Sequence, residues 1–145
     1  MAYQALNPSF AQEVNDSFAR QSIMSLIGAH LTRVDPGVVE ITLPFRGDLT
    51  QQHGYVHAGV ISTIADSACG YAAYSLMPAA SEVLSIEFKI NLLRPAKGDS
   101  FVARAEVIRP GKTVSAVRAE VFAVKDKTEI LIASMQATMM CLGKE

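Results

Sequence analysis

Asp66 is the residue whose place in the sequence most clearly suggests chemistry. It lies in an apolar stretch, residues 54–78, and it is the only carboxylate between Asp48 and Glu82. No lysine or arginine occurs between residues 46 and 89. A buried carboxylate without a nearby cation is costly, so this placement favours a hydrogen-bonded network or a group that accepts a proton during a reaction. The alternative is an exposed Asp66 on the one polar stripe of a helix.

Two histidines, His53 and His57, flank Gly54 just before the same stretch becomes helical. The free backbone N–H groups and the positive dipole end of a helix that begins here could polarise a carbonyl oxygen. His57 and Asp66 are nine positions apart, which is about 900° of rotation, so they point to opposite sides of one helix. Only two copies of the chain, related by a dimer axis, could bring them together. The alternative is that both histidines only satisfy loop backbone groups.

Other reactive arrangements are missing from the sequence. The helical serines Ser62, Ser67 and Ser75 lack a Gly-x-Ser-x-Gly elbow, and no His-Glu-x-x-His, Walker A or Gly-x-Gly-x-x-Gly motif occurs. Cys69 and Cys141 form neither a disulfide framework nor a metal-ligand cluster. With no ligand cluster and no cofactor-binding motif, we expect no metal and no redox cofactor.

The composition describes one domain of ordinary size. The chain has 145 residues, of which 50% are hydrophobic and 19% charged, with a mass of 15.6 kDa and a mean hydropathy of +0.23. These values exclude disorder and leave apolar surface for contacts between subunits. The net charge of −1, with scattered lysines and arginines, excludes an electrostatic grip on nucleic acid or an anionic membrane. Two cysteines and no secretory signal pattern indicate the cytoplasm.

Hydrophobic periodicity predicts the helices that must position these residues. Residues 1–28 read as an N-terminal helical segment, with Phe10, Val14 and Phe18 at fourfold spacing and a capping box formed by Ser9 and Gln12. The segment His57 to Met77 is apolar almost all round, which predicts a long helix buried in the core. A membrane span is rejected, because the amphipathic segments that follow need this helix to cover one of their faces.

Strands are predicted around this helix. His30 to Pro44 reads as a hairpin about an Asp-Pro-Gly turn. Four amphipathic strands follow as an antiparallel meander, and the inward sides of the first and last are expected to be Leu84, Ile86, Phe88, Ile90 and Leu92, and Leu131, Ala133, Met135, Ala137 and Met139. The expected fold is α+β, a curved antiparallel sheet around one long helix.

Three motifs resemble those of the hotdog-fold acyl-CoA thioesterases, in the PaaI-like branch associated with phenylacetate degradation. They are GYVHAGVISTIADSACGYAA at residues 54–73, SIEFKINLLRP at residues 85–95 and RPGKT at residues 109–113. The spacing of His-x-Gly nine residues before Asp is the specific part. The resemblance implies a single hotdog domain over residues 1–145, active sites between subunits, and a homodimer or a dimer of dimers.

The resemblance also assigns roles to individual residues. It implies that Asp66 is the catalytic carboxylate, acting on water or on the thioester, and that the backbone N–H at Ala58, with Gly59 beside it, polarises the thioester oxygen. His57 begins this motif, in which Ala58 replaces the more frequent Gly. Gln51 stands where relatives often carry Asn, six residues before His57.

Three further residues are expected to bind substrate. Ser85 matches a serine that helps to hold water in some relatives, although strict alternation puts it on the face of Glu87 and Lys89. Arg94 and Lys112 fall at strand ends, where they are either solvated or in contact with CoA phosphates. The sequence therefore predicts hydrolysis of an acyl or aryl-acyl CoA thioester. A non-catalytic acyl-CoA-binding protein is the alternative, and a hydratase is disfavoured because the Asp/Asn-Pro-x-His stretch is absent.

Overall fold

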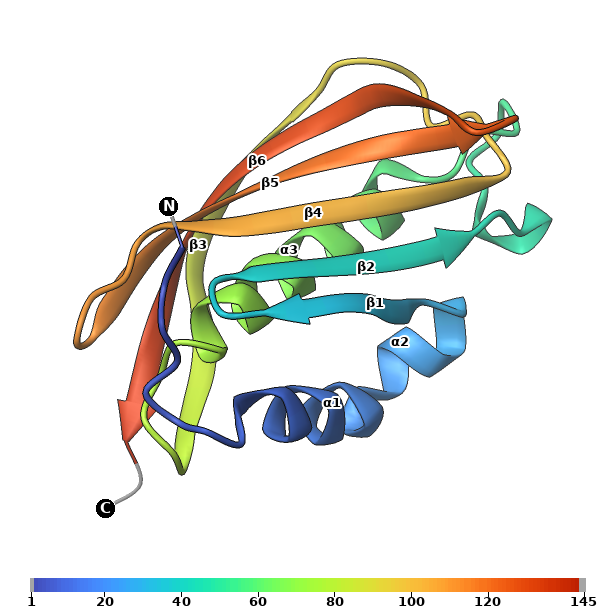
Figure 1. Cartoon of the computed structure of the whole chain (residues 1–145). Coiled ribbons are helices and arrows are strands. Elements are labelled where there is room, and N and C mark those ends of the chain that lie inside the picture. The colour runs from blue at the N-terminus through green and yellow to red at the C-terminus, as the bar shows by residue number, and fades with distance from the viewer. Residues whose placement is uncertain (1, 144–145) are drawn as a thin grey trace.

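A six-stranded antiparallel sheet curves around one long helix, α3 (Ala58–Tyr74), in the computed structural model, which describes residues 2–143 (Figure 1). The sheet order is β1-β2-β4-β5-β6-β3. The strands are β1 (His30–Asp35), β2 (Val38–Pro44), β3 (Ser81–Leu92), β4 (Ser100–Arg109), β5 (Val114–Lys125) and β6 (Thr128–Gly143). The predicted α+β architecture and the hairpin over His30 to Pro44 are confirmed.

Alanines on α3 let the sheet approach its backbone closely. Ala65, Ala68 and Ala72 are fully buried against the inner faces of the strands. The helix begins one residue later and ends three residues earlier than predicted, because His57 caps its start and a tight turn with a Leu76 N–H to Ala73 C=O bond ends it. Among residues 2–143, none of the helices is both long and apolar enough to cross a membrane.

The N-terminal helical segment is two helices, α1 (Phe10–Arg20) and α2 (Ser22–Ile27), separated by an extended Gln21. The second helix ends at Gly28, whose φ of 79° is the left-handed conformation that glycine adopts without strain. The predicted capping box is wrong, because the Ser9 side chain makes no cap hydrogen bond. Asn7 provides the local bond instead, since its Oδ1 accepts from the Ser9 N–H at 2.9 Å.

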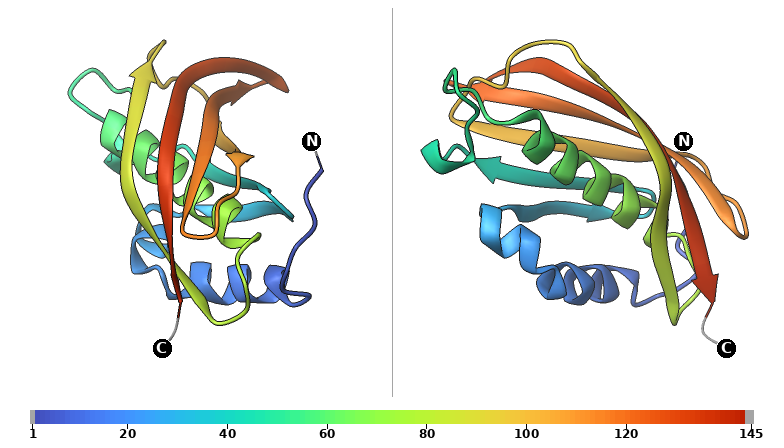
Figure 2. Two further views of the ribbon diagram at one scale, coloured as in Figure 1. Left: turned by 90° about the vertical axis from the view of Figure 1, so that its left-hand side faces the viewer. Right: turned by 180° about the vertical axis from the view of Figure 1, so that it is seen from behind.

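The predicted meander holds for β4, β5 and β6 but is wrong for β3. That strand pairs with β6 at the far edge of the sheet, and the connection over residues 93–99 crosses back to β4 (Figures 1 and 2). Seven residues can span at most about 23 Å when extended, whereas three strand spacings are about 14 Å. The connection is therefore long enough to skip two strands, and local sequence pattern alone does not reveal that it does.

A bulge in β3 changes which side chains face the helix. The register with β6 shifts between Ser85 and Glu87, so Ile86 is an extra residue. Strict alternation therefore fails at this point, and Ser85 faces α3 instead of sharing a face with Glu87 and Lys89. The predicted inward positions Leu84 and Ile86 are wrong for the same reason, and both side chains are about half exposed. Phe88 and Leu92 are also predicted to be inward, but at this edge of the sheet they too are about half exposed.

A second bulge lies in β6, where the register with β5 shifts between Val121 and Phe122. Leu131 is consequently only partly buried, whereas Ile132 is 2% exposed and takes the inward place. The prediction for Leu131 is therefore wrong by one position. The other predicted inward residues of β6 are all buried.

Candidate active site

The N-terminus of α3 carries one backbone donor that is left available. The His57 Nδ1 atom accepts from the Gly59 N–H at 2.8 Å, and the His57 carbonyl accepts from the N–H groups of Val60 and Ile61. The Ala58 N–H has no acceptor within residues 2–143. It therefore points into the space before the helix at the positive end of the dipole, where it could bind a carbonyl oxygen.

Gly59 leaves room for this cap. A Cβ atom at position 59 would lie 3.0 Å from His57 Nδ1, which is closer than ordinary van der Waals contact. The glycine thus lets the imidazole close over the first turn and occupy the Gly59 N–H. The free backbone N–H donor is therefore that of Ala58, whereas Gly59 makes room for the His57 ring.

The loop before the helix is built on Gln51. Its Oε1 atom accepts from the backbone N–H of His53 at 2.5 Å and from that of Tyr55 at 3.3 Å. Gly54 completes the turn with a φ of 83°. The carboxamide oxygen of Gln51 is therefore occupied by the loop, and its NH₂ group is the end left for a ligand. His53 is exposed and does not line the pocket described next.

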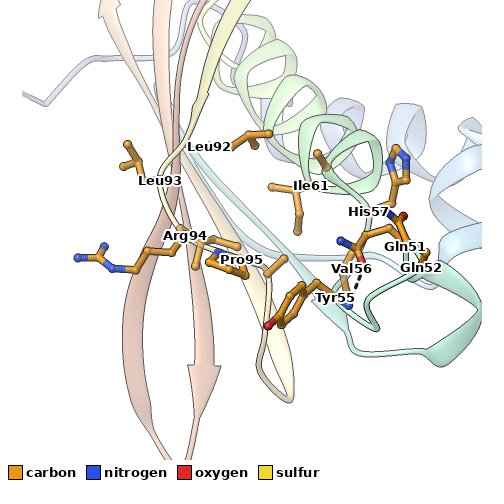
Figure 3. Close-up of a pocket in the computed structure, with 13 residues that line it drawn as sticks. Gln51, Gln52, Tyr55, Val56, His57, Ile61, Leu92, Leu93, Arg94 and Pro95 are labelled. Carbon is orange, nitrogen blue, oxygen red and sulfur yellow. Dashed lines mark hydrogen bonds between the residues drawn. The ribbon is translucent and has the colours of Figure 1, made fainter.

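A pocket of about 500 Å³ opens beside this helix end, and Gln51, His57 and Ala58 lie on its rim. Figure 3 shows Arg94 reaching away from Ile61, and its Nη1 donates to the Leu131 carbonyl at 2.7 Å. Most of the wall is apolar, formed by Val56, Ile61, Leu92, Leu93, Pro95, Ala96 and Ile132. Such a wall suits the hydrocarbon part of a ligand.

Asp66 lies two turns further along α3, in a different pocket. The Ser85 hydroxyl donates to Asp66 Oδ1 at 2.7 Å, which leaves Oδ2 without a protein donor among the described residues. The β3 bulge makes this contact possible by turning Ser85 toward the helix. The pocket measures about 220 Å³ and is lined mainly by polar side chains: Ser17, Gln21, Asp66, Ser67, Tyr71, Tyr74, Glu82 and Ser85.

One chain does not bring all predicted site residues together. His57 and Asp66 line different pockets, as their nine-residue spacing predicts. Arg94 follows β3 beside the larger pocket, whereas Lys112 lies in the exposed turn between β4 and β5 at the other end of the sheet. Within residues 2–143, no three His, Cys, Asp or Glu side chains gather as metal ligands would.

Sequence reasoning missed the part of the site that the N-terminal helices supply. Ser17 and Gln21 lie more than forty residues before Asp66 in the chain, and no periodic or motif signal connects them with it. Tyr71 and Tyr74 follow Asp66 on α3 and also line this pocket. The burial of Tyr74 and the carboxylates of Glu13 and Glu82 raise the pKa of its phenol.

Cys69 is one turn from Asp66 and is fully buried. Burial, and then the negative charge of Asp66, raise the pKa of its thiol far above the usual range. A thiol that stays protonated is a poor nucleophile, so Cys69 packs as a small apolar side chain.

Comparison with known proteins identifies the family. The family model described as "Thioesterase superfamily" matches residues 53–130, which is more than half of the chain. The acyl-coenzyme A thioesterase PaaI of Escherichia coli is 27% identical over 133 residues, covering 90% of this chain and 89% of PaaI. The crystal structure of a thioesterase family protein from Silicibacter pomeroyi has 50% identity and a TM-score of 0.92, over 93% of this chain and 99% of that one.

The fold agrees with these sequence matches. The structure of E. coli PaaI superimposes with a TM-score of 0.84 over 96% of this chain and 97% of PaaI, at 21% identity. The curved sheet around α3 is thus the hotdog fold that the motifs predicted. The chain belongs to the thioesterase superfamily and is a hotdog-fold thioester hydrolase of the PaaI type.

Proposed function

We propose that this protein hydrolyses acyl-CoA thioesters in sites that two copies of the chain share. The observation that carries the proposal is the separation of two half-sites on one helix. The Ala58 N–H and an apolar pocket lie at one end, and the Asp66–Ser85 pair lies in another pocket. Each half has what the other lacks. The name of E. coli PaaI, an acyl-coenzyme A thioesterase, supports the substrate class.

In this proposal the two copies of the chain contact each other through the edge strand β3. It is an edge strand of twelve residues whose only partner within the described chain is β6. Four of its apolar side chains, Leu84, Ile86, Phe88 and Leu92, are 43–58% exposed. A long apolar edge with unpaired backbone groups is a template for pairing with another strand. An antiparallel pair of β3 strands about a two-fold axis would satisfy both edges.

This pairing would bring unlike half-sites together. Ser85 on β3 contacts Asp66, and Leu92 at the end of the same strand lines the apolar pocket. An antiparallel pair centred near Phe88 and Lys89 sets the Ser85 end of one β3 strand beside the Leu92 end of the β3 strand in the partner subunit. Each Asp66 then faces the larger pocket of the other copy. The dimer would hold two equivalent sites.

The chemistry follows from what each half offers. The thioester carbonyl oxygen accepts from the Ala58 N–H, which stabilises the charge that develops on it during attack. Ser85 holds Asp66 through Oδ1, so Oδ2 is free to take a proton from water as the water oxygen bonds to the carbonyl carbon. The carbon–sulfur bond then breaks, and the CoA thiolate leaves and takes up a proton. Direct attack by Asp66, through an anhydride that water later opens, uses the same contacts.

The proposed pairing also brings together the two cations, Arg94 and Lys112, that are expected to bind substrate. In a single chain Arg94 and Lys112 lie at opposite ends of the sheet. Lys112 lies at the same end as Ser85, because Ser115 pairs with Met139 and Met139 pairs with Ser85. The antiparallel dimer therefore sets Lys112 of one copy near Arg94 of the partner subunit. We assign both to the CoA phosphates, where cations bind anionic oxygens well.

Release of free thiol from a panel of acyl-CoA and aryl-acyl CoA thioesters tests this function. We expect turnover with CoA thioesters and little with oxygen esters of the same acyl groups, which lack the CoA phosphates. The matched blank is the same panel without enzyme. If no thioester is cleaved while calorimetry shows tight acyl-CoA binding, the chain is a binding protein and the proposal fails.

A further inference from the structure

The break between α1 and α2 places an amide side chain beside the helix that carries Asp66. Gln21 has an extended backbone, with φ −77° and ψ 97°, between two helical segments. Its Nε2 donates to the Tyr71 hydroxyl at 2.7 Å, and its Oε1 accepts from the Ser67 hydroxyl at 3.3 Å. Ser67 and Tyr71 are four residues apart on α3, so one side chain spans a full turn of that helix.

The Tyr71 hydroxyl is a junction in this network. The ring is 3% exposed, and the hydroxyl also lies 3.2 Å from the Ser17 hydroxyl of α1. A hydroxyl on a side chain this buried needs such partners. Val14 is the only fully buried residue of α1. The Phe18 and Tyr71 rings also pack together, with centroids 6.0 Å apart, so polar and aromatic contacts together hold α1 against α3.

The same residues form a wall of the Asp66 pocket. Ser17 and Gln21 line it from the N-terminal helices, and Ser67 and Tyr71 line it from α3. Ser67 is also the next residue after Asp66. A shift of Gln21 would therefore widen the pocket on one side and release the Ser67 side chain, which lies next to the carboxylate in the sequence.

We propose that Gln21 is a positioning residue of the hydrolytic site. It acts through Ser67 and Tyr71, fixes the N-terminal helices against α3, and completes the polar wall that holds water next to Asp66. The proposal rests on the role given above to Asp66. It goes beyond that role, because it makes the N-terminal segment part of the site.

Gln21→Met is the main test, since methionine keeps the length of the side chain and removes both hydrogen bonds. We expect kcat to fall about 10- to 100-fold, because small displacements of positioned groups cost this much. KM should stay within about threefold, because the apolar pocket and the cations are untouched. Gln12→Met is the matched control. Gln12 is exposed on α1 and bonds only to Asp16, so its variant should keep the parent kcat.

A double-mutant cycle separates positioning from loss of stability. Tyr71→Phe removes the hydroxyl that Gln21 contacts. If the two residues act as one unit, the double variant loses no more kcat than the worse single variant. Independent losses that multiply would overturn the proposed route through Tyr71. Melting curves on all variants show whether each is folded at the assay temperature.

Gln21→Glu keeps the test decisive if Gln21→Met does not fold. A carboxylate at this position can accept from both the Ser67 and Tyr71 hydroxyls. We expect its kcat to lie between those of the parent and of Gln21→Ala. Parent-like kcat in Gln21→Met or Gln21→Ala overturns the inference but leaves the proposed function intact, provided that Asp66→Asn is inactive. Parent-like turnover in Asp66→Asn would contradict both the inference about Gln21 and the proposed function.

Discussion

The N-terminal end of α3 and its middle offer opposite surroundings to a substrate. At Ala58 a pocket of about 500 Å³ has mostly apolar walls and one free backbone N–H. Around Asp66 a pocket of about 220 Å³ is mostly polar and carries a hydrogen-bonded carboxylate. A single N–H stabilises a developing oxyanion best where water is excluded. A carboxylate is less costly to hold where polar groups surround it. In the proposed dimer the two environments meet at one site, and each chain supplies one of them.

Asp66→Asn is the change that should break the polar half most severely. Asparagine keeps the shape and can keep the contact with Ser85, but it cannot accept a proton as a carboxylate does. We expect kcat to fall about 100- to 10,000-fold, while acyl-CoA binding measured by calorimetry persists. Asp35→Asn, on the exposed edge strand β1, is the matched control. Turnover in Asp66→Asn within about threefold of the parent would remove Asp66 from the mechanism.

Ala58→Pro attacks the apolar half by deleting its backbone donor. Proline is favoured at the first position of a helix. The preceding residue, His57, already has φ −59° and ψ 137°, which suits a residue before proline. The fold should therefore survive, and kcat should fall about 100- to 1,000-fold. Ala58→Gly, which keeps the N–H, is the control and should retain turnover.

Mixing these two inactive variants tests whether the halves come from different chains. After subunit exchange, a mixed dimer has one site with both defects and one site with neither. Recovery of about a quarter of the parent rate is expected, because half of the dimers are mixed and each has one intact site. No recovery, with exchange shown by mass spectrometry, would place both halves in one chain and contradict the shared site.

Phe88→Lys should separate the two subunits without altering the half-sites that each one carries. Phe88 lies near the centre of β3 and is 43% exposed. Pairing about that centre would bring two lysines together, and facing like charges oppose strand pairing. Light scattering should show the parent at two or four times 15.6 kDa and the variant at lower mass. Turnover should fall with the loss of dimer. A monomeric, fully active parent would contradict the assembly.

Ser85→Ala tests whether the hydrogen bond from Ser85 holds the Asp66 carboxylate for catalysis. It removes the hydroxyl that donates to Asp66 Oδ1 at 2.7 Å. A hydrogen bond to a charged group is typically worth about 1.5 to 3 kcal/mol. Part of that is recovered by water, so we expect kcat to fall about 10-fold and KM to change little. Ser134→Ala, on the exposed outer side of β6, is the control. An unchanged kcat would show that the Ser85 contact does not hold the carboxylate for catalysis.

Replacing the cations should have the smallest effect, and it should appear in KM. Arg94→Ala and Lys112→Ala should each raise KM several-fold with kcat nearly constant, because phosphate contacts persist from ground state to transition state. Steady-state kinetics at low and high salt measure this. Lys125→Ala, in the exposed end of β5, is the control. If KM is unchanged in both variants, these two side chains are only solvated strand ends.

The sequence by itself determined the elements, because their signals are local. Alternation predicted four amphipathic strands after the long helix, and the Asp-Pro-Gly turn predicted the first hairpin. The isolation of Asp66 and the free N–H groups before α3 marked the two half-sites. The nine-residue spacing also showed that His57 and Asp66 diverge, since helical rotation is a property of the chain alone.

Only the tertiary structure decided what is non-local. The bulge at Ile86 turned Ser85 toward Asp66, and a bulge depends on strand pairing that residue types do not specify. The crossing of β3 to the far edge depends on which strands fit against α3. Gln21 reached the Asp66 pocket because two helices pack against a third, and packing joins residues that share no sequence pattern.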